Sequence, residues 1–348
     1  MKPIFRIPSM IEINSSAYHG STVVSTFSGG GGSSLGYRMA GFKVLWANEF
    51  IDEARETYRA NFPTTKLDGR DIRDVRAEDI LRETGLAEGE LDLFDGSPPC
   101  AAFSVSGKGA DAWGTVKKYS DKAQRVDDLF FEYTRLLRGL QPRVFVAENV
   151  KGLIKGKAKG YFKLILAELK SCGYNVEARI VNALYLGVAQ SRERLIFIGV
   201  RSDLDAAPVY PKPFPYVYTI REALDGCDAT VERELSMAGY QIGREWRTLK
   251  PGEWSEKRFN LWRAHFDVPC QTIVAITGNP TTASVAHPTE CRKFSVAETK
   301  RLCGFPDDFV LTGDPIQKIE RLGRAVPPPM MRAIASTLET NLLSRVEA

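Results

Sequence analysis

Two side chains with reactive chemistry each follow a short apolar stretch. Cys100 ends the run Gly-Ser-Pro-Pro-Cys at 96–100, and Glu148 begins Glu-Asn-Val at 148–150. The prolines restrict the turn and present the thiol at its tip, whereas a lone cysteine is more usually a small buried hydrophobe. A thiolate attacks electron-poor carbon, and a nearby carboxylic acid can protonate the group under attack. No histidine lies between His19 and His265, so a papain-like pair would need a distant partner.

A glycine-rich turn precedes these residues. Residues 27–36 read Phe-Ser-Gly-Gly-Gly-Gly-Ser-Ser-Leu-Gly, and free backbone amides in such a turn, at the start of a helix, favour a negative group. Glu49 follows about 20 residues later, where a carboxylate can accept hydrogen bonds from ribose hydroxyls. Asp71 could accept a hydrogen bond from an adenine amino group, or could simply cap a helix. The turn alone also fits a flexible surface loop, but together these features predict a nucleoside cofactor, either a dinucleotide or S-adenosylmethionine.

The elements that must position these residues alternate between short β-branched runs and longer amphipathic stretches from Ser21 to Arg201. This alternation predicts βαβ units and therefore a doubly wound, mostly parallel, Rossmann-like α/β sheet. The expected strands are 22–26, 43–48, 91–95, 144–148, 175–181 and 195–200, and the expected helices are 51–61, 127–140, 161–171, 297–303 and 329–343. Because ligands bind at the carboxyl ends of such strands, Cys100 and Glu148 should share one cleft if their strands are neighbours.

The same residues resemble the motifs of a known family, the DNA (cytosine-5) methyltransferases, in the family's order from near residue 22 to near residue 340. Residues 96–100 resemble its proline-cysteine nucleophile motif, and residues 148–150 its ENV motif. The segment 190–194 is similar to QxRxR, residues 301–306 are similar to RLQGFP, and residues 323–328 are similar to GNAVPP.

The resemblance implies S-adenosylmethionine as cofactor and methylation at carbon 5 of cytosine in DNA. Addition of the Cys100 thiolate at carbon 6, with Glu148 bonding to or protonating N3, would make carbon 5 nucleophilic. By resemblance, Arg194 would contact O2 of the base and Arg192 would support the pocket. The residues expected to contact the cofactor are Phe27, Ser28, Gly29, Gly31, Glu49, Asp71, Ile72, Pro98 and Leu129.

A base stacked inside a duplex cannot be attacked at carbon 6, so the target cytosine must leave the helix and a loop should close over it. Residues 101–125 meet that need, because they contain several glycines and more basic than acidic residues. Ser104, Ser106 and Lys108 are the expected DNA contacts of this loop. Without Cys100 beside it, the same composition would also fit a solvated linker.

Four prolines between residues 208 and 215 mark a change of composition, typical of an extended linker. We expect a catalytic, cofactor-binding domain at 1–202, a small target-recognition domain at 203–290, and a C-terminal segment at 291–348 that returns to the first domain. Aromatic and basic residues are interleaved between 244 and 266. This composition suits DNA contacts, for which we expect Arg244, Arg247 and Arg258, although the aromatics could also be the core of so small a domain.

Three residues depart from the family pattern. Ala101 stands where glutamine usually follows the cysteine, Arg324 replaces the asparagine of GNAVPP, and Cys303 replaces the glutamine of RLQGFP. None of these changes removes a reacting group, but they leave room for altered activity or a modified substrate.

Bulk composition restricts the class of protein. A formal charge of +4 is too small to indicate nucleic-acid binding by itself. The six cysteines form no CxxC pair, so no metal site is predicted, and no run approaches the ~20 apolar residues of a membrane span. We expect a cytoplasmic, prokaryotic or phage-encoded monomer that acts on double-stranded DNA, with a cognate restriction endonuclease as a candidate partner.

Three alternative functions stay open at this point. A non-catalytic DNA-binding relative would have no chemical reason to retain Cys100, Glu148 and Arg194 together. The tRNA-modifying branch carries a Cys-Phe-Thr tripeptide, which this sequence lacks. A nicotinamide-dependent oxidoreductase would explain the glycine turn but not the nucleophile and the acid.

Overall fold

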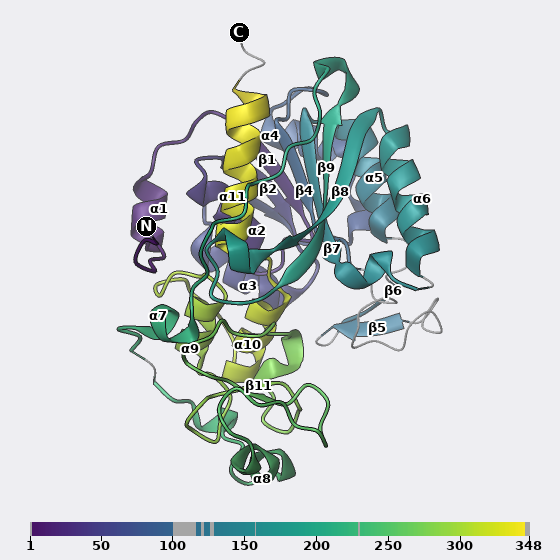
Figure 1. The fold of residues 1–348 in the computed structure, drawn as a ribbon. Coiled ribbons are helices and arrows are strands. Elements are labelled where there is room, and N and C mark those ends of the chain that lie inside the picture. The colour runs from purple at the N-terminus through teal and green to yellow at the C-terminus, as the bar shows by residue number, and fades with distance from the viewer. Residues whose placement is uncertain are drawn as a thin grey trace.

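The computed structural model describes residues 2–99, 116–119, 122–125, 129–156, 158–228 and 230–344. Figure 1 shows a large sheet covered by helices on both faces, with a region of shorter elements below it. None of the helices in the described ranges combines the length and apolar character needed to span a membrane.

A seven-stranded sheet has the order β3-β2-β1-β4-β7-β9-β8. The five parallel strands are β1 (Thr22–Thr26), β2 (Lys43–Asn48), β3 (Lys66–Asp68), β4 (Leu93–Gly96) and β7 (Val144–Val150). β9 (Glu193–Arg201) runs antiparallel between β7 and β8 (Tyr174–Asn182). The winding reverses between β1 and β4, the position where such sheets bind ligands. The predicted doubly wound, mostly parallel sheet is confirmed.

Alternate residues of each strand point to opposite faces of this sheet. Phe145 and Phe197 belong to the core shared with α5 (Leu129–Leu140) and α6 (Ala158–Ser171). Val146 and Ile198 belong to the core shared with α2 (Gly32–Met39) and α11 (Pro328–Leu338). Because both faces of the sheet centre are buried, the central strands β4, β7 and β9 are mainly apolar rather than alternately polar and apolar. The remaining helices beside the sheet are α1 (Met10–Ser15), α3 (Asp52–Asn61) and α4 (Ala77–Thr84).

The contact between α2 and α11 joins distant parts of the chain. A Cβ added at Gly36 would lie 2.5 Å from Cβ of Met331 and 2.6 Å from the carbonyl oxygen of Pro328. Only a glycine lets the two helices approach so closely. The C-terminal helix therefore supports the helix that begins at the glycine turn.

Shorter elements lie below the sheet (Figure 1). They are α7 (Ile220–Leu224), α8 (Gln241–Thr248), β10 (Trp262–Arg263), β11 (Val285–Ala286), α9 (Val296–Leu302) and α10 (Pro315–Arg324). Met237, Trp246 and Leu261 belong to a small separate core, whereas Ile220 and Leu302 share a larger core with Tyr58 of α3. A further described element is the antiparallel pair of strands β5 (Val116–Tyr119) and β6 (Lys122–Arg125).

Most expected elements lie within a few residues of their observed positions. β4 begins at Leu93, two residues later than expected, and α11 ends at Leu338 and continues as a π-helical turn over Glu339–Leu343. Among the features that were not predicted are the antiparallel direction of β9 and helix α10. Both contribute residues to the cavity described next.

Candidate active site

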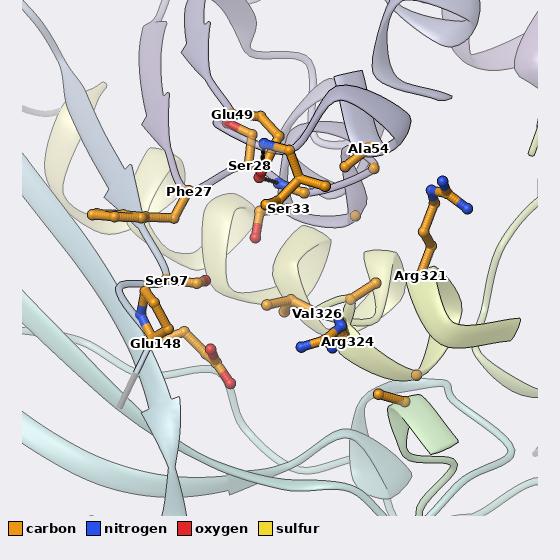
Figure 2. A pocket seen from close by; sticks show the side chains of 18 of the residues that line it. Phe27, Ser28, Ser33, Glu49, Ala54, Ser97, Glu148, Arg321, Arg324 and Val326 are labelled. Carbon is orange, nitrogen blue, oxygen red and sulfur yellow. Dashed lines mark hydrogen bonds between the residues drawn. The ribbon is translucent and has the colours of Figure 1, made fainter. Parts of the chain in front are cut away.

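A cavity of about 470 Å³ opens at the carboxyl ends of β1, β2, β4 and β7. This volume is in the range of small-molecule sites. One part of its wall is the glycine turn with Glu49, a second part comprises Ser97, Pro98, Pro99 and Glu148, and a third belongs to α10 and the residues after it (Figure 2). The glycine turn and Glu148 therefore line one cavity.

The glycine turn begins at Phe27, which has a positive φ of 53°, and Gly31 takes φ 97° as the N-cap of α2. A Cβ at Gly31 would lie 2.4 Å from Cε2 of Phe62, and one at Gly32 would lie 2.4 Å from the carbonyl oxygen of Val326. These glycines let the turn lie close to two other segments. Phe27, Ser28 and Gly29 all line the cavity.

Glu49 joins the glycine turn to the start of α3. Its carboxylate accepts hydrogen bonds from the backbone amides of Gly29 and Ile51, each at 2.7 Å. Burial raises the pKa of Glu49, against the effect of these amides. The carboxylate lies in the cavity wall where a ribose-binding acid was predicted. Each of its oxygens has a further lone pair that can accept another hydrogen bond.

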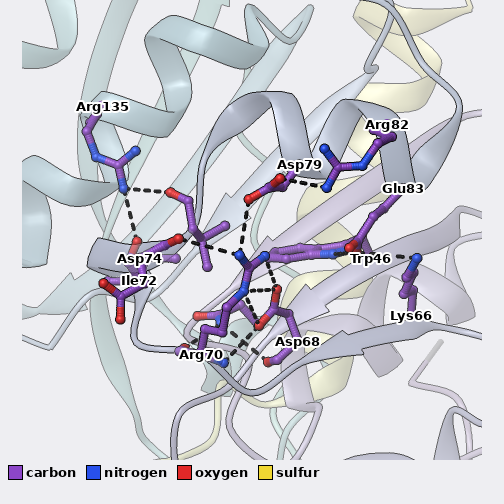
Figure 3. Close-up of polar contacts among 12 residues, drawn as sticks. Trp46, Lys66, Asp68, Arg70, Ile72, Asp74, Asp79, Arg82, Glu83 and Arg135 are labelled. Carbon is purple, nitrogen blue, oxygen red and sulfur yellow. Dashed lines mark hydrogen bonds and ion pairs between the residues drawn. The ribbon is translucent and has the colours of Figure 1, made fainter.

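Asp71 and Ile72 occupy the turn after β3. Asp71 accepts a hydrogen bond from the amide of Arg73 and pairs with its guanidinium, whereas Ile72 lines the cavity. The Ile72 carbonyl accepts a hydrogen bond from Arg135 at 3.0 Å. Nearby, Arg70 pairs with Asp68 and with Asp79 of α4 (Figure 3). This network fixes the turn that presents Ile72.

Glu148 and Arg194 form an ion pair inside the cavity. Nε of Arg194 lies 2.8 Å from Oε1 of Glu148, and both side chains are largely buried. β7 presents Glu148 near its carboxyl end, and β9, being antiparallel, brings its own amino end to the same edge, with Val150 opposite Arg194. The direction of β9 is therefore what places the predicted arginine beside the predicted acid.

Asn149 connects this strand to the turn that precedes Cys100. Its Nδ2 donates to the carbonyl oxygen of Pro98 at 3.2 Å, and the side chain is buried. Pro98 and Pro99 line the cavity. Cys100, together with the predicted DNA contacts Ser104, Ser106 and Lys108, lies outside the described residues. We did not predict the role of Asn149, although the resemblance to ENV could have indicated it.

Arg192 is buried and holds the segment after α10. It donates to the carbonyl oxygens of Ile273 at 2.8 Å, Gly323 at 2.8 Å and Ala325 at 2.9 Å. Burial, and after it the neighbouring Arg194, lower the pKa of Arg192 to about 9. Since backbone carbonyl oxygens take up its two terminal nitrogens, Arg192 is a positioning residue in this arrangement. The expectation that it supports the pocket fits this geometry.

Asp95 is a buried acid that we did not single out from the sequence. It lies near the end of β4 and accepts hydrogen bonds from the hydroxyls of Ser25 at 2.7 Å and Tyr37 at 3.0 Å. Burial raises the pKa of Asp95 to about 7, although these hydroxyls favour the charged form. The group joins β1, α2 and β4 directly beneath the cavity.

Some predicted contacts lie away from the cavity wall. Leu129 begins α5 and is fully buried in the core that α5 and α6 share with the sheet. In the 203–290 segment, Arg244 and Arg247 are exposed on α8, and Arg258 donates to Gln241.

The aromatic residues of this segment divide between two environments. Trp246 and Trp262 are buried, and the indole of Trp246 donates to the carbonyl of His287. Trp254 is 50% exposed and Phe259 is 80% exposed. The core interpretation therefore holds for Trp246 and Trp262, whereas Trp254 and Phe259 stay predicted candidates for DNA contact.

Two of the three departures from the family pattern lie in described residues. Cys303 is buried and accepts a hydrogen bond from Gln190 at 3.3 Å, and burial raises the pKa of its thiol to about 11. Arg324 lines the cavity and donates to Oε1 of Glu320 through Nε at 3.0 Å and Nη2 at 2.7 Å. Ala101 lies outside the described residues.

Comparison with known proteins agrees with this site. A profile of the family described as C-5 cytosine-specific DNA methylase matches residues 21–340. The chain is 31% identical over 340 residues to the Type II methyltransferase M.Sau96I of Staphylococcus aureus, covering 91% of this chain and 75% of that protein. It is 33% identical over 347 residues to the Type II methyltransferase M.PspPI of Psychrobacter sp. (strain TA137), covering 91% and 78%.

Solved structures share the fold. A protein from an E. coli prophage, solved as a candidate DNA modification methyltransferase, has a TM-score of 0.72 at 24% identity, covering 93% of this chain and 100% of that chain. A DNMT2 variant from Spodoptera frugiperda has a TM-score of 0.68 at 18% identity, covering 92% and 100%. The chain belongs to the C-5 cytosine-specific DNA methylase family and is a DNA (cytosine-5)-methyltransferase.

Proposed function

We propose that the protein transfers a methyl group from S-adenosylmethionine to carbon 5 of a cytosine flipped out of duplex DNA, through a covalent adduct of Cys100. The observation that carries this proposal is the Glu148–Arg194 ion pair, which lines the same cavity as the glycine turn. The residues proposed to activate the cytosine and those proposed to bind the cofactor thus line one cavity.

The described residues fit the cofactor. Glu49 would accept from ribose hydroxyls, the glycine turn would approach the amino-acid end, and Phe27 and Ile72 would supply apolar contacts. S-adenosylmethionine supplies an electrophilic methyl group on a sulfonium. The chain's own contribution is to orient that group and to activate the base.

Activation of the base uses three side chains. The Cys100 thiolate would add to carbon 6 while Glu148 holds or protonates N3 and Arg194 contacts O2. Carbon 5 then takes the methyl group, its proton leaves, and expulsion of the thiolate restores aromaticity. Because carbon 6 is stacked in a duplex, the reaction requires base flipping.

Residues 203–290 are proposed to form the target-recognition domain, with residues 1–202 and 291–348 forming the catalytic part. Exposed Arg244 and Arg247 on α8, and the exposed aromatics Trp254 and Phe259, support a DNA-contacting surface. The Type II relatives suggest a cognate restriction endonuclease as partner, and we propose a monomer acting on DNA in the cytoplasm.

The direct test is transfer of tritiated methyl from S-adenosylmethionine to unmethylated genomic DNA, followed by base-resolution sequencing. The expected result is label in cytosine at one recurrent sequence. Cys100→Ala should abolish transfer and retain DNA binding. Turnover by the Cys100→Ala protein would contradict the covalent route, and label in a base other than cytosine would contradict the proposed substrate.

A further inference from the structure

Arg324 places a cation in the wall of the cofactor cavity, where the family resemblance leads one to expect a neutral asparagine. Arg324 is the last residue of α10, and Glu320 and Arg321 of the same helix also line the cavity. In Figure 2, Arg324 extends into the space that Glu148 enters from the other side.

The backbone around Arg324 is held from both sides. Arg192 donates to the carbonyls of Gly323 and Ala325, the two neighbours of this residue. The carbonyl group of the next residue, Val326, lies close to Gly32. A Cβ added at Gly32 would be 2.4 Å from the carbonyl oxygen of Val326. These contacts fix the direction in which the side chain at 324 leaves the chain, which is into the cavity.

A purely structural role accounts for part of this arrangement. A cation in the last turn of a helix is favourable, and an exposed i,i+4 pair with Glu320 stabilises a helix only slightly. However, an arginine at any exposed helix position could stabilise a helix in this way. The structural role therefore does not explain why the guanidinium lies in this cavity. The pair is 48% and 34% exposed at Arg324 and Glu320 respectively, so a ligand can reach both.

Charge decides which ligand group such an arginine fits. The other described arginines of the cavity wall are engaged differently: Arg194 pairs with Glu148, whereas Arg192 and Arg321 hold backbone carbonyls. A guanidinium repels a sulfonium, and Glu320 on the same helix offsets part of that repulsion; a carboxylate of the ligand would offset it further. Its planar donors match a carboxylate, which they can bind through two parallel hydrogen bonds.

We propose that Arg324 binds a carboxylate of the sulfonium cofactor, and this inference rests on the proposed function. Two carboxylates meet this description. One belongs to the amino-acid end of S-adenosylmethionine, where Glu320 would face the ammonium group. The other would be carried by the transferred carbon itself, in a cofactor whose methyl group is replaced by carboxymethyl.

In the second case the product is 5-carboxymethylcytosine. Carbon 5 of the Cys100 adduct bonds to the carboxymethyl carbon, and the carbon–sulfur bond breaks with its electron pair staying on sulfur, which becomes a neutral thioether. The proton on carbon 5 then leaves to a base, and the thiolate of Cys100 departs. No oxidant or reductant is needed.

The experiment is calorimetric binding by the full chain and by Arg324→Asn. The probes are S-adenosylhomocysteine, its decarboxylated analogue, S-adenosylmethionine and the carboxymethyl sulfonium analogue. Arg332→Asn, an exposed arginine on α11, is the charge-matched control. A double variant, Glu320→Gln with Arg324→Asn, removes both charges of the pair, so that a newly unpaired Glu320 cannot explain the result. Melting temperatures check that each variant is folded.

At least a tenfold loss of S-adenosylhomocysteine affinity in both Arg324 variants, with the decarboxylated analogue unchanged, assigns the amino-acid carboxylate. Preference of the unaltered protein for the carboxymethyl analogue over S-adenosylmethionine, reversed by Arg324→Asn, assigns the transferred group. Mass spectrometry of nucleosides from treated DNA then distinguishes methylcytosine from carboxymethylcytosine. Affinities within twofold for every probe overturn the inference. If the unaltered protein binds no adenosyl probe, the proposed function itself fails.

Discussion

Nε of Arg194 lies 2.8 Å from Oε1 of Glu148, so the acid expected to activate the base is held by a residue from the neighbouring antiparallel strand. Removing the charge of the acid should impair chemistry more than binding. For Glu148→Gln we expect the single-turnover rate to fall about 100-fold or more, as is typical for loss of a general acid. Affinity for S-adenosylhomocysteine should stay within twofold.

The matched control is Glu177→Gln, which removes a carboxylate paired with Arg179 on the exposed strand β8. Its rate should equal that of the unaltered protein. A normal rate for Glu148→Gln would show that another group activates N3.

Arg192 should be essential for holding the cavity wall together. Arg192→Lys keeps the charge but loses the planar donors that reach the carbonyls of Ile273, Gly323 and Ala325. We expect unfolding by urea to be easier by about 2–4 kcal/mol, because buried carbonyls lose their donors. Cofactor affinity should fall at least tenfold. Reduced stability with unchanged affinity of the folded fraction would mean that Arg192 does not position the cavity wall.

Asp95 should make stability depend on pH in an unusual direction. Its native pKa is raised to about 7 by burial, so between about pH 4 and pH 7 the native state binds more protons than the unfolded state. The contribution of Asp95 to stability is therefore complete at low pH and is lost as pH rises through 7. Asparagine does not ionise, so the stability of Asp95→Asn should not decrease in this way.

The measurement is urea denaturation of both proteins from pH 5 to pH 8. The stability of Asp95→Asn relative to the unaltered protein should rise with pH, mainly between pH 5 and pH 7 and by up to about 3 kcal/mol, at roughly 1.4 kcal/mol per pKa unit. Parallel curves would show that Asp95 is charged in the native state throughout.

The exposed arginines of α8 should contribute to DNA affinity through phosphate contacts. Arg244→Ala with Arg247→Ala should weaken binding to all sequences alike and reduce the slope of log affinity against log salt by about 1–2. Arg82→Ala, an exposed arginine on α4, should leave the slope unchanged. An unaltered slope in the double variant would place α8 away from the DNA.

The residues that define the site could be identified from the sequence because short motifs carry their chemistry locally. Glu49 and Glu148 each follow a strand, and strand ends meet at one edge of a doubly wound sheet. The direction of β9 could not be predicted, since a continuously apolar strand reads alike in either orientation. The partners of Arg192 lie up to 133 positions away, and spacing along a sequence does not reveal such contacts.

The division of the aromatics illustrates the same difficulty within one short segment. Trp246 is buried and Trp254 is half exposed, yet both stand among basic residues. Trp246 lies on the face of α8 that packs on the small core, whereas Trp254 follows that helix, and tertiary contacts decide the burial of each. Arg324 reaches the cavity because α10 ends there, and we did not predict α10.

The close approach of α11 to Gly36 also orders the events of protein synthesis. α2 leaves the ribosome early, but the residues that cover it at Gly36, Pro328 and Met331, are translated only after all the sheet strands and the other described α-helices. Until then the face of α2 around Gly36 lacks the residues that cover it. The nascent chain must keep this surface exposed until α11 has been translated, a period in which chaperones commonly bind. Competence to methylate DNA should therefore arise abruptly once α11 has been made rather than growing with chain length.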